Sequence, residues 1–306
     1  MKQQNFQAIQ VGETFGPVQF PVDDHFVKGF AFAVDDWSSS YFKAPGICGP
    51  WAHSSGIAKK LLHIFMEGYD PQGIKAVHLK EDVWFHAPVP FGETITLKGQ
   101  YTDKFVRKGR PSVVLDAEAR DSSGRLLVKQ RSVEIVSSSE KLEEREQKHS
   151  ESLSSRRVSA AWPADKQVVA KAADASATDT PLPVLVKTIH QDQMSMFVGA
   201  NDNWKNIHTD PDVAREAGFD TTIMSGMIQV CWFTEMMVSF FGPGFLSGGQ
   251  LGATFLAPVK NRESIECRAV MRQIGADGSL EVEFWSTNGN GQMTAAGWAI
   301  GKSGRA

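Results

Sequence analysis

Two segments of the chain have the hydrophobic pattern of central helices. Residues 226–241, GMIQVCWFTEMMVSFF, are apolar on nearly every face and are followed by Gly-Pro-Gly at 242–244, residue types that end helices. A helix without a polar face has to be surrounded by protein, and about four turns are too few to cross a bilayer. Residues 54–69, SSGIAKKLLHIFMEGY, are more amphipathic. We expect this helix to have one wetter side.

Alternating apolar and polar residues follow each predicted helix. Residues 112–135 and 280–300 both predict β-hairpins, because period-two runs are joined there by Ser-Gly or Asn-Gly turns. Each half of the chain therefore has the same order: a β-like entry, a loop, a helix and a run of strands. This order predicts an α+β fold in which one buried helix is wrapped by a curved antiparallel sheet, present twice.

Matching residues support a tandem duplication. Phe30, Asp35, Asp36 and Trp37 match Phe197, Asp202, Asn203 and Trp204 at an offset of 167, and residues 84–95 match 254–265 at an offset of 170. Such self-similarity is the sequence signature of a repeat. Residues 137–180, rich in Ser, Ala and mixed charge, are typical of a surface linker. We predict two copies, at 1–136 and 181–306, on either side of it.

Composition narrows the class of protein. The 306 residues carry a net charge of −3 without a basic stripe, so neither nucleic acid nor a membrane surface is an expected partner. Cys48, Cys231 and Cys267 are odd in number and far apart, which favours free thiols in a reducing compartment. We expect no disulfide, no metal site and no cofactor. The first fifteen residues have no apolar leader pattern, which favours a cytoplasmic protein.

A polar run at 197–210, FVGANDNWKNIHTD, holds the candidate chemistry. Together with VAREAGF at 213–219, IMSGM at 223–227 and FLAPV at 255–259, it resembles the MaoC-like dehydratase family, also called hydratase 2 or R-specific enoyl-CoA hydratases. The resemblance extends over essentially the whole chain as a double hot dog, because residues 84–95 copy the same Pro-Val strand.

The resemblance implies hydration of an enoyl thioester, or dehydration of a 3-hydroxyacyl thioester, carried by coenzyme A or an acyl carrier protein. His208 matches the catalytic histidine, whose pKa near neutrality suits acid/base work. Gly226 matches the glycine whose N–H faces the thioester oxygen, at a helix N-terminus that favours negative charge. The residues do not indicate whether hydration or dehydration is the natural direction, because the same site lowers the barrier of both reactions.

The partner of His208 differs from the family pattern. Asn203 stands where the family has Asp, and an amide can hold a water but cannot take its proton near pH 7. Three alternatives remain: Asn203 positions the water for His208 alone, Asp202 turns in, or the site has lost hydration chemistry.

The first copy shows the complementary change. Asp36 occupies the acid position, but Tyr41 stands at the histidine position. The resemblance implies that this copy shapes the acyl tunnel, and we assign Asp36, Met227 and Trp204 to substrate binding, with loop packing as the alternative for the tryptophan. His53, where the first helix begins, is expected to make a helix-start hydrogen bond, with a ligand role as the alternative.

Two rival functions stay open. The chain could be a non-catalytic double hot dog that binds acyl-CoA or scaffolds an active partner, as a homodimer or heteromer through hot-dog surfaces. It could also be a thioesterase, for which Glu235 on the second helix is the candidate carboxylate. Asp210 before Pro211 is expected to cap the helix that follows.

Overall fold

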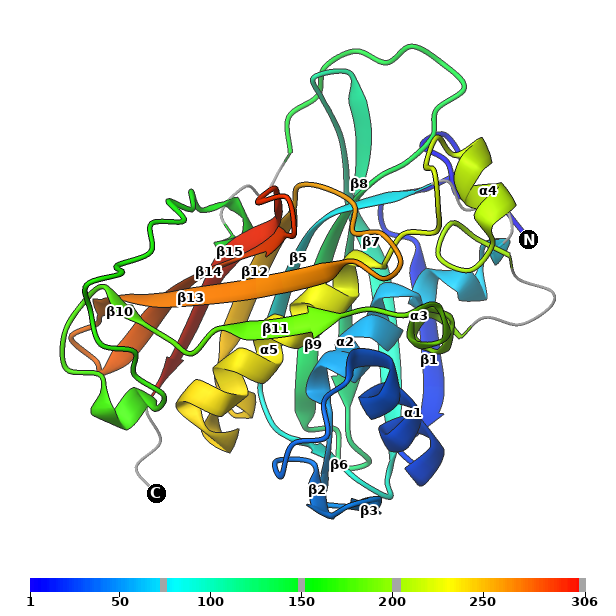
Figure 1. Cartoon of the computed structure of the whole chain (residues 1–306). Coiled ribbons are helices and arrows are strands. Elements are labelled where there is room, and N and C mark those ends of the chain that lie inside the picture. The colour runs from blue at the N-terminus through cyan, green and yellow to red at the C-terminus, as the bar shows by residue number, and fades with distance from the viewer. Residues whose placement is uncertain (72–75, 148–151, 200–204, 303–306) are drawn as a thin grey trace.

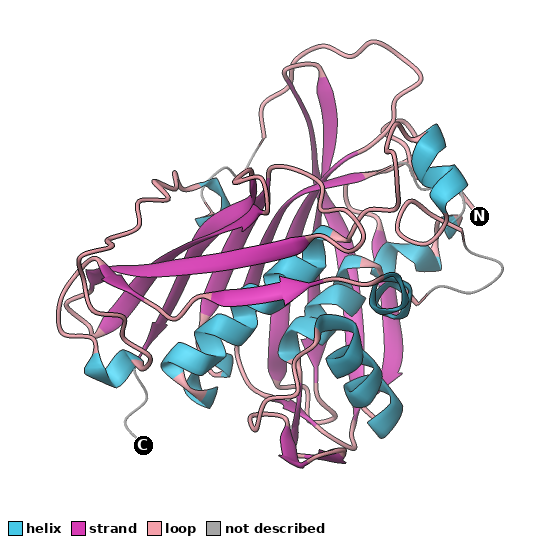
Figure 2. Ribbon diagram, viewed as in Figure 1, coloured by secondary structure: helices cyan, strands magenta, loops and turns pink. Residues whose placement is uncertain are grey.

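One curved antiparallel sheet organises the molecule (Figures 1 and 2). The computed structural model describes residues 1–71, 76–147, 152–199 and 205–302. Within these residues the sheet has eleven strands, in the order β1-β7-β8-β9-β5-β12-β15-β14-β13-β10, with β11 also paired to β13. The strands are β1 Thr14–Pro21, β5 Val77–Phe85, β7 Thr94–Arg107, β8 Arg110–Arg120, β9 Leu126–Ile135, β10 Thr180–Pro181, β11 Leu185–Thr188, β12 Gln250–Phe255, β13 Ser264–Ile274, β14 Ser279–Asn288 and β15 Met293–Lys302.

The strand order repeats the predicted duplication. The first copy contributes β1-β7-β8-β9-β5, and the second contributes β12-β15-β14-β13-β11 in the mirrored sense. The copies join where β5 pairs antiparallel with β12, from Trp84 opposite Gln250 to Lys80 opposite Thr254. The predicted hairpins are confirmed as β8–β9 and β14–β15. The double hot dog is therefore one continuous sheet, and the domain boundaries at 136 and 181 stay a prediction.

Two central helices lie against this sheet, α2 Ser54–Leu62 and α5 Gly226–Phe241. The prediction for 226–241 is confirmed, and Gly242 ends α5 at a φ of 80°. The prediction of a wetter side on the first helix is wrong. Eight of the nine residues of α2 are buried, including Lys59, because the second copy covers the side that the first copy alone would leave open.

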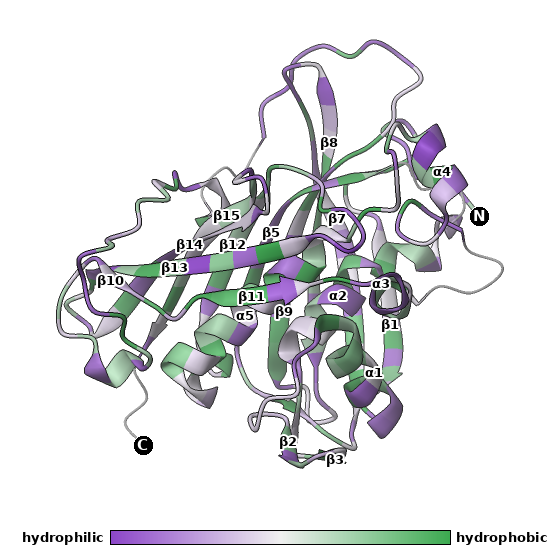
Figure 3. Cartoon of the chain, viewed as in Figure 1, coloured by the Kyte–Doolittle hydropathy of each residue, from purple (hydrophilic) through white to green (hydrophobic). Residues whose placement is uncertain are grey.

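Two further helices occupy segments for which the sequence predicted no helix, and a third begins after Asp210, as predicted. Helix α1 (Asp24–Val34) and helix α3 (Gln191–Val198) precede the two matched motifs and pack on one another. Asp35 ends α1 in the left-handed conformation, with a φ of 54°, and Gly199 ends α3 with a φ of 72°. The second copy adds α4 (Pro211–Glu216), whose side chains are mostly hydrophilic (Figure 3). The first copy has the short strands β2 Phe42–Ala44, β3 Ile47–Cys48 and β4 Trp51–Ala52 there, and β6 Val89–Pro90 pairs with β4.

The linker crosses the outer face of the sheet. Ser154 donates from its N–H and its hydroxyl to the buried carboxylate of Asp82, at 3.0 and 2.6 Å. A Cβ at Gly252 would lie 2.3 Å from the Ser154 nitrogen. Short 3-10 turns are the regular structure along this segment (Leu153–Ser155 and Ala172–Asp174). The linker is thus packed on the junction of the two copies.

Candidate active site

His208 lies in a short turn that is tied to the start of the central helix. The side-chain oxygen of Asn206 accepts from the His208 N–H at 2.8 Å, and Gln191 donates to the His208 carbonyl at 2.9 Å. The Ile223 N–H donates to the Ile207 carbonyl at 3.1 Å. Ile223 is three residues before α5, so these bonds hold the turn beside the helix N-terminus.

The two nitrogens of the His208 ring have different roles. Nδ1 lies 2.8 Å from the Ile223 carbonyl oxygen. A carbonyl oxygen only accepts, so Nδ1 carries the proton and the lone pair of the neutral ring is on Nε2. Burial lowers the pKa of His208 below its usual value of 6.5, against the opposing effect of this hydrogen bond. The ring is therefore a neutral base at pH 7.

Gly226 is the first residue of α5, where N–H groups have no intrahelical acceptor. The Ser225 side chain makes no cap hydrogen bond. A Cβ on Gly226 would lie 2.9 to 3.1 Å from ring atoms of Phe255, so glycine is also needed to let this ring pack on the helix start. The adjacent Met227 is fully buried in the core.

Asp210 has the predicted capping role. Its carboxylate accepts from the N–H groups of Asp212 and Val213, with Pro211 in the first turn of α4. Asn203, Asp202 and Trp204 lie outside the described residues, so the choice of partner for His208 stays a prediction.

The sequence missed a set of buried polar residues that the first copy contributes near His208. Burial lowers the pKa of His63 well below its usual value, and the charges of Lys59 and His208 lower it further. His78 lies 3.0 Å from Glu81, and its ring is 4.6 Å from that of Phe255. The only signal in the sequence was the four-residue spacing of Lys59 and His63, which puts them on one side of a helix.

Asp36, at the acid position of the first copy, is close to a histidine. This histidine is His53, and Tyr41 stands at the position that matches His208. Asp36 is 5% exposed, and Nε2 of His53 lies 3.0 Å from its backbone carbonyl oxygen and 3.5 Å from its Oδ2. His53 precedes α2 without a side-chain cap bond, so the expected helix-start hydrogen bond is wrong. The ring of Tyr41 lies over that of His53, with centroids 3.7 Å apart.

Glu235 of α5 forms an ion pair with Lys187 and lies far from Gly226 at the start of the helix. Its carboxylate lies 3.0 Å from Nζ of Lys187 on β11. Burial raises the pKa of Glu235 to about 7. Nine residues separate it from Gly226, which is roughly 13 Å along an α-helix.

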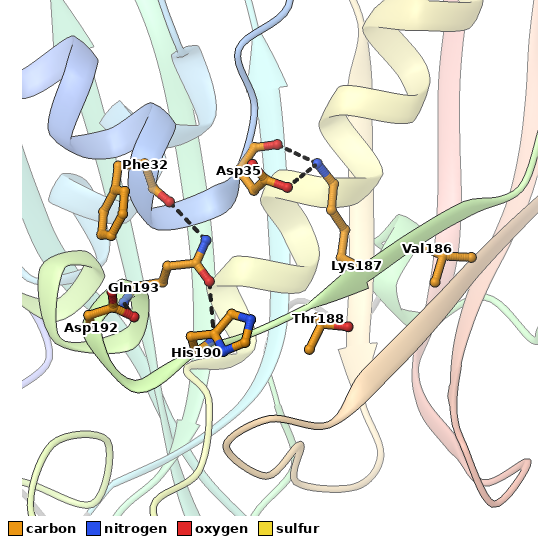
Figure 4. A pocket seen from close by; sticks show the side chains of 8 residues that line it. All are labelled: Phe32, Asp35, Val186, Lys187, Thr188, His190, Asp192 and Gln193. Carbon is orange, nitrogen blue, oxygen red and sulfur yellow. Dashed lines mark hydrogen bonds and ion pairs between the residues drawn. The ribbon is translucent and has the colours of Figure 1, made fainter.

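A hollow of about 430 Å³ in the surface is lined in part by Lys187, and His208 is not among the residues that line it. Its side chains come from α1, from β11 and from the start of α3 (Figure 4). Figure 4 shows Lys187 bonded to Asp35 across it, and Gln193 bonded to the Phe32 carbonyl. Lys187 and Gln193 of this hollow therefore already bond groups of the first copy.

Two kinds of feature are absent from the described residues. No three His, Cys, Asp or Glu side chains there are grouped so that they could hold a metal ion. No helix in that part of the chain is long and apolar enough to cross a membrane.

Comparisons with known proteins define the class. Residues 171–283 match the family described as MaoC like domain, so the resemblance is confirmed and the second half of the chain carries a MaoC-like domain. The match spans His208 and Gly226. A comparison with curated protein sequences gives no significant match.

Solved structures extend the likeness to the whole chain. One titled MaoC-like dehydratase is 15% identical with a TM-score of 0.74, over 98% of this chain and 100% of the other. A putative MaoC domain protein dehydratase from Chloroflexus aurantiacus is 13% identical with a TM-score of 0.68, over 99% and 98%. A conserved hypothetical protein from Mycobacterium tuberculosis, described as a double hot-dog fold, is 13% identical with a TM-score of 0.61, over 98% and 97%. At these identities they establish the double hot-dog fold.

Proposed function

We propose that the protein is a hydratase or dehydratase that interconverts an enoyl thioester and a 3-hydroxyacyl thioester of coenzyme A. The observation that carries this proposal is the hydrogen bond from His208 Nδ1 to the Ile223 carbonyl. It leaves Nε2 as the base, in a turn fixed beside the N-terminus of α5. The MaoC-like domain match over the same residues supports it.

The reaction needs a proton carrier and a site for negative charge. His208 Nε2 takes a proton from water as the water oxygen bonds to the β-carbon, and the same proton is then delivered to the α-carbon. Charge that develops on the thioester oxygen is stabilised by the Gly226 N–H, aided by the helix N-terminus. Asn203 holds the water in this scheme, and Asp202 is the alternative partner.

His208→Ala is expected to lower kcat for hydration of an enoyl-CoA by about 10² to 10⁴-fold, the usual contribution of one acid/base group. The loss of enoyl absorbance measures the rate of hydration, and the melting temperature shows whether the variant is folded. Asn203→Asp, assayed beside it, is expected to keep or raise activity. Unchanged turnover in His208→Ala, in a folded protein, would exclude this residue as the base and favour the non-catalytic acyl-CoA-binding rival.

A thioesterase is disfavoured by the ion pair of Glu235 with Lys187 and by its distance from Gly226. Free thiol released from acyl-CoA, measured with a thiol reagent, distinguishes the two reactions. We expect none from a hydratase.

A further inference from the structure

Lys59 is a buried lysine whose ammonium group lacks a partner in the part of the chain that the structure describes. The residue is 6% exposed, and Nζ lies over the Phe197 ring, 5.7 Å from its centroid. No described carboxylate or hydrogen-bond acceptor stabilises it, and burial lowers its pKa to about 7. Taking an unpaired ammonium out of water costs several kcal/mol, so the position needs an explanation.

Another buried lysine shows how this protein satisfies such a group. Lys187 is 8% exposed, and its ammonium bonds the Asp35 carbonyl and lies 3.0 Å from the Glu235 carboxylate. Lys59 is as deeply buried and has neither kind of partner among the described residues. An anion that is not part of the protein would complete its surroundings.

Lys59 faces the interior between the copies, on the side of His208. His63, the residue that follows α2, lies about one turn after Lys59, and both Lys59 and His208 lower its pKa. Helix α2, which carries Lys59, packs on α5. The lysine therefore lies beside the central helix that begins at Gly226.

We propose, on the basis of the function above, that the acyl group of the substrate ends in a carboxylate and that Lys59 binds it. The substrate class is then the coenzyme A monothioester of an unsaturated dicarboxylic acid. The thioester oxygen is bound at the Gly226 N–H, and the distal carboxylate pairs with the ammonium. A purely apolar acyl chain would leave this ammonium buried and uncompensated.

The test compares substrates that differ only in a methyl or a carboxylate at the far end. Hydration of fumaryl-, glutaconyl- and 2-hexenedioyl-CoA is measured beside that of crotonyl-, 2-pentenoyl- and 2-hexenoyl-CoA. We expect kcat/KM for at least one carboxylated member to exceed that of its neutral counterpart by about tenfold or more, the usual size of a charged hydrogen bond. Lys59→Met is expected to remove this preference.

Lys60→Met is the matched control. Lys60 is the next residue of the same helix, and its ammonium lies 4.9 Å from the Phe20 ring centroid. We expect this variant to keep the natural ratio of carboxylated to neutral turnover. The proposal would be overturned if Lys59→Met and Lys60→Met lowered the ratio of carboxylated to neutral turnover equally. It would also be overturned if the natural protein preferred the neutral substrate of every pair.

Binding of saturated analogues separates this inference from the catalytic one. Succinyl-, glutaryl- and adipyl-CoA are titrated by calorimetry beside butyryl-, valeryl- and hexanoyl-CoA. A carboxylate preference that is lost in Lys59→Met supports the lysine site even if hydration is never seen. No preference in the natural protein overturns it, whether or not Lys59→Met folds.

Discussion

The surroundings of His208 decide what its side chain can do. The Ile223 carbonyl holds the proton on Nδ1, and burial disfavours the charged ring. Both effects favour a base that acts through Nε2. An exposed histidine of the same sequence context would be partly protonated near pH 6.5 and would not have a fixed tautomer.

The direction of this pKa shift predicts the pH dependence of activity. The base has to be neutral, and its pKa is lowered below 6.5, so we expect the acid limb of kcat/KM to fall at a pH below 6.5. Activity is kept above that pKa and is lost as pH falls through it. Rate profiles, with NMR titration of the ring, check this.

His25→Gln, which removes an exposed histidine on α1, is the control and should leave the profile unchanged. An acid limb above pH 6.5 that follows the His208 titration would contradict the inferred surroundings of the ring.

At the scale of elements, the loop after α1 is fastened to the start of α2 by Asp36 and His53. Asp36 also accepts from the Ser38 N–H at 3.1 Å. Desolvation raises the pKa of Asp36, but the interaction with His53 and the hydrogen bonds from Ser38 together lower it more, so the net shift is downward. The pair therefore stabilises the fold when the carboxylate is charged.

Asp36→Asn is expected to lower the free energy of unfolding by about 1 to 3 kcal/mol at pH 7, because it removes one partner of a buried charged hydrogen bond. The folded pKa is below the usual 3.8, so this stabilisation is present above pH 3.8 and is lost as pH falls through the folded pKa. Urea unfolding at several pH values measures the difference.

Asp174→Asn, at an exposed linker position, should have no such effect. The Asp36→Asn variant could lose the same free energy of unfolding at pH 7 as at a pH below the folded pKa of Asp36. That result would show that the carboxylate charge does not stabilise the fold.

At the scale of the whole molecule, the linker closes the junction between the copies. Ser154 lies on Asp82 of β5 and over Gly252 of β12, the two strands that join the halves. Trp298 of β15 donates to the Arg157 carbonyl at 3.1 Å. The segment therefore adds packing to the strand pair at this junction.

Asp82→Ala is expected to release this segment, since the two hydrogen bonds to Ser154 are lost. Trypsin should then cut after Arg156 or Arg157 several-fold faster, because cleavage follows the population of the open segment. Gel analysis of timed digests measures the rate. Asp165→Ala, at an exposed position of the same linker, is the control, and equal rates in the two variants would contradict a fastened linker.

The sequence by itself determined the features that depend on local pattern and on internal repetition. The helix at 226–241 and both hairpins follow from periodicity and turn residues, and the double hot dog follows from the repeat. His208 and Gly226 were predicted as site residues because their motif is contiguous or nearly so. These features depend on residues that are close together in the sequence, so they can be predicted from the sequence alone.

Only the tertiary structure decided which distant residues meet, both within a copy and between the two copies. The burial of α2 and its Lys59, the Asp36–His53 pair and the tie from His208 to Ile223 join residues that are 15 or more positions apart, or lie in different copies. The physical reason is that burial and desolvation depend on every element that covers a residue. A lysine in an amphipathic helix pattern is expected in water until the second copy is seen to cover it.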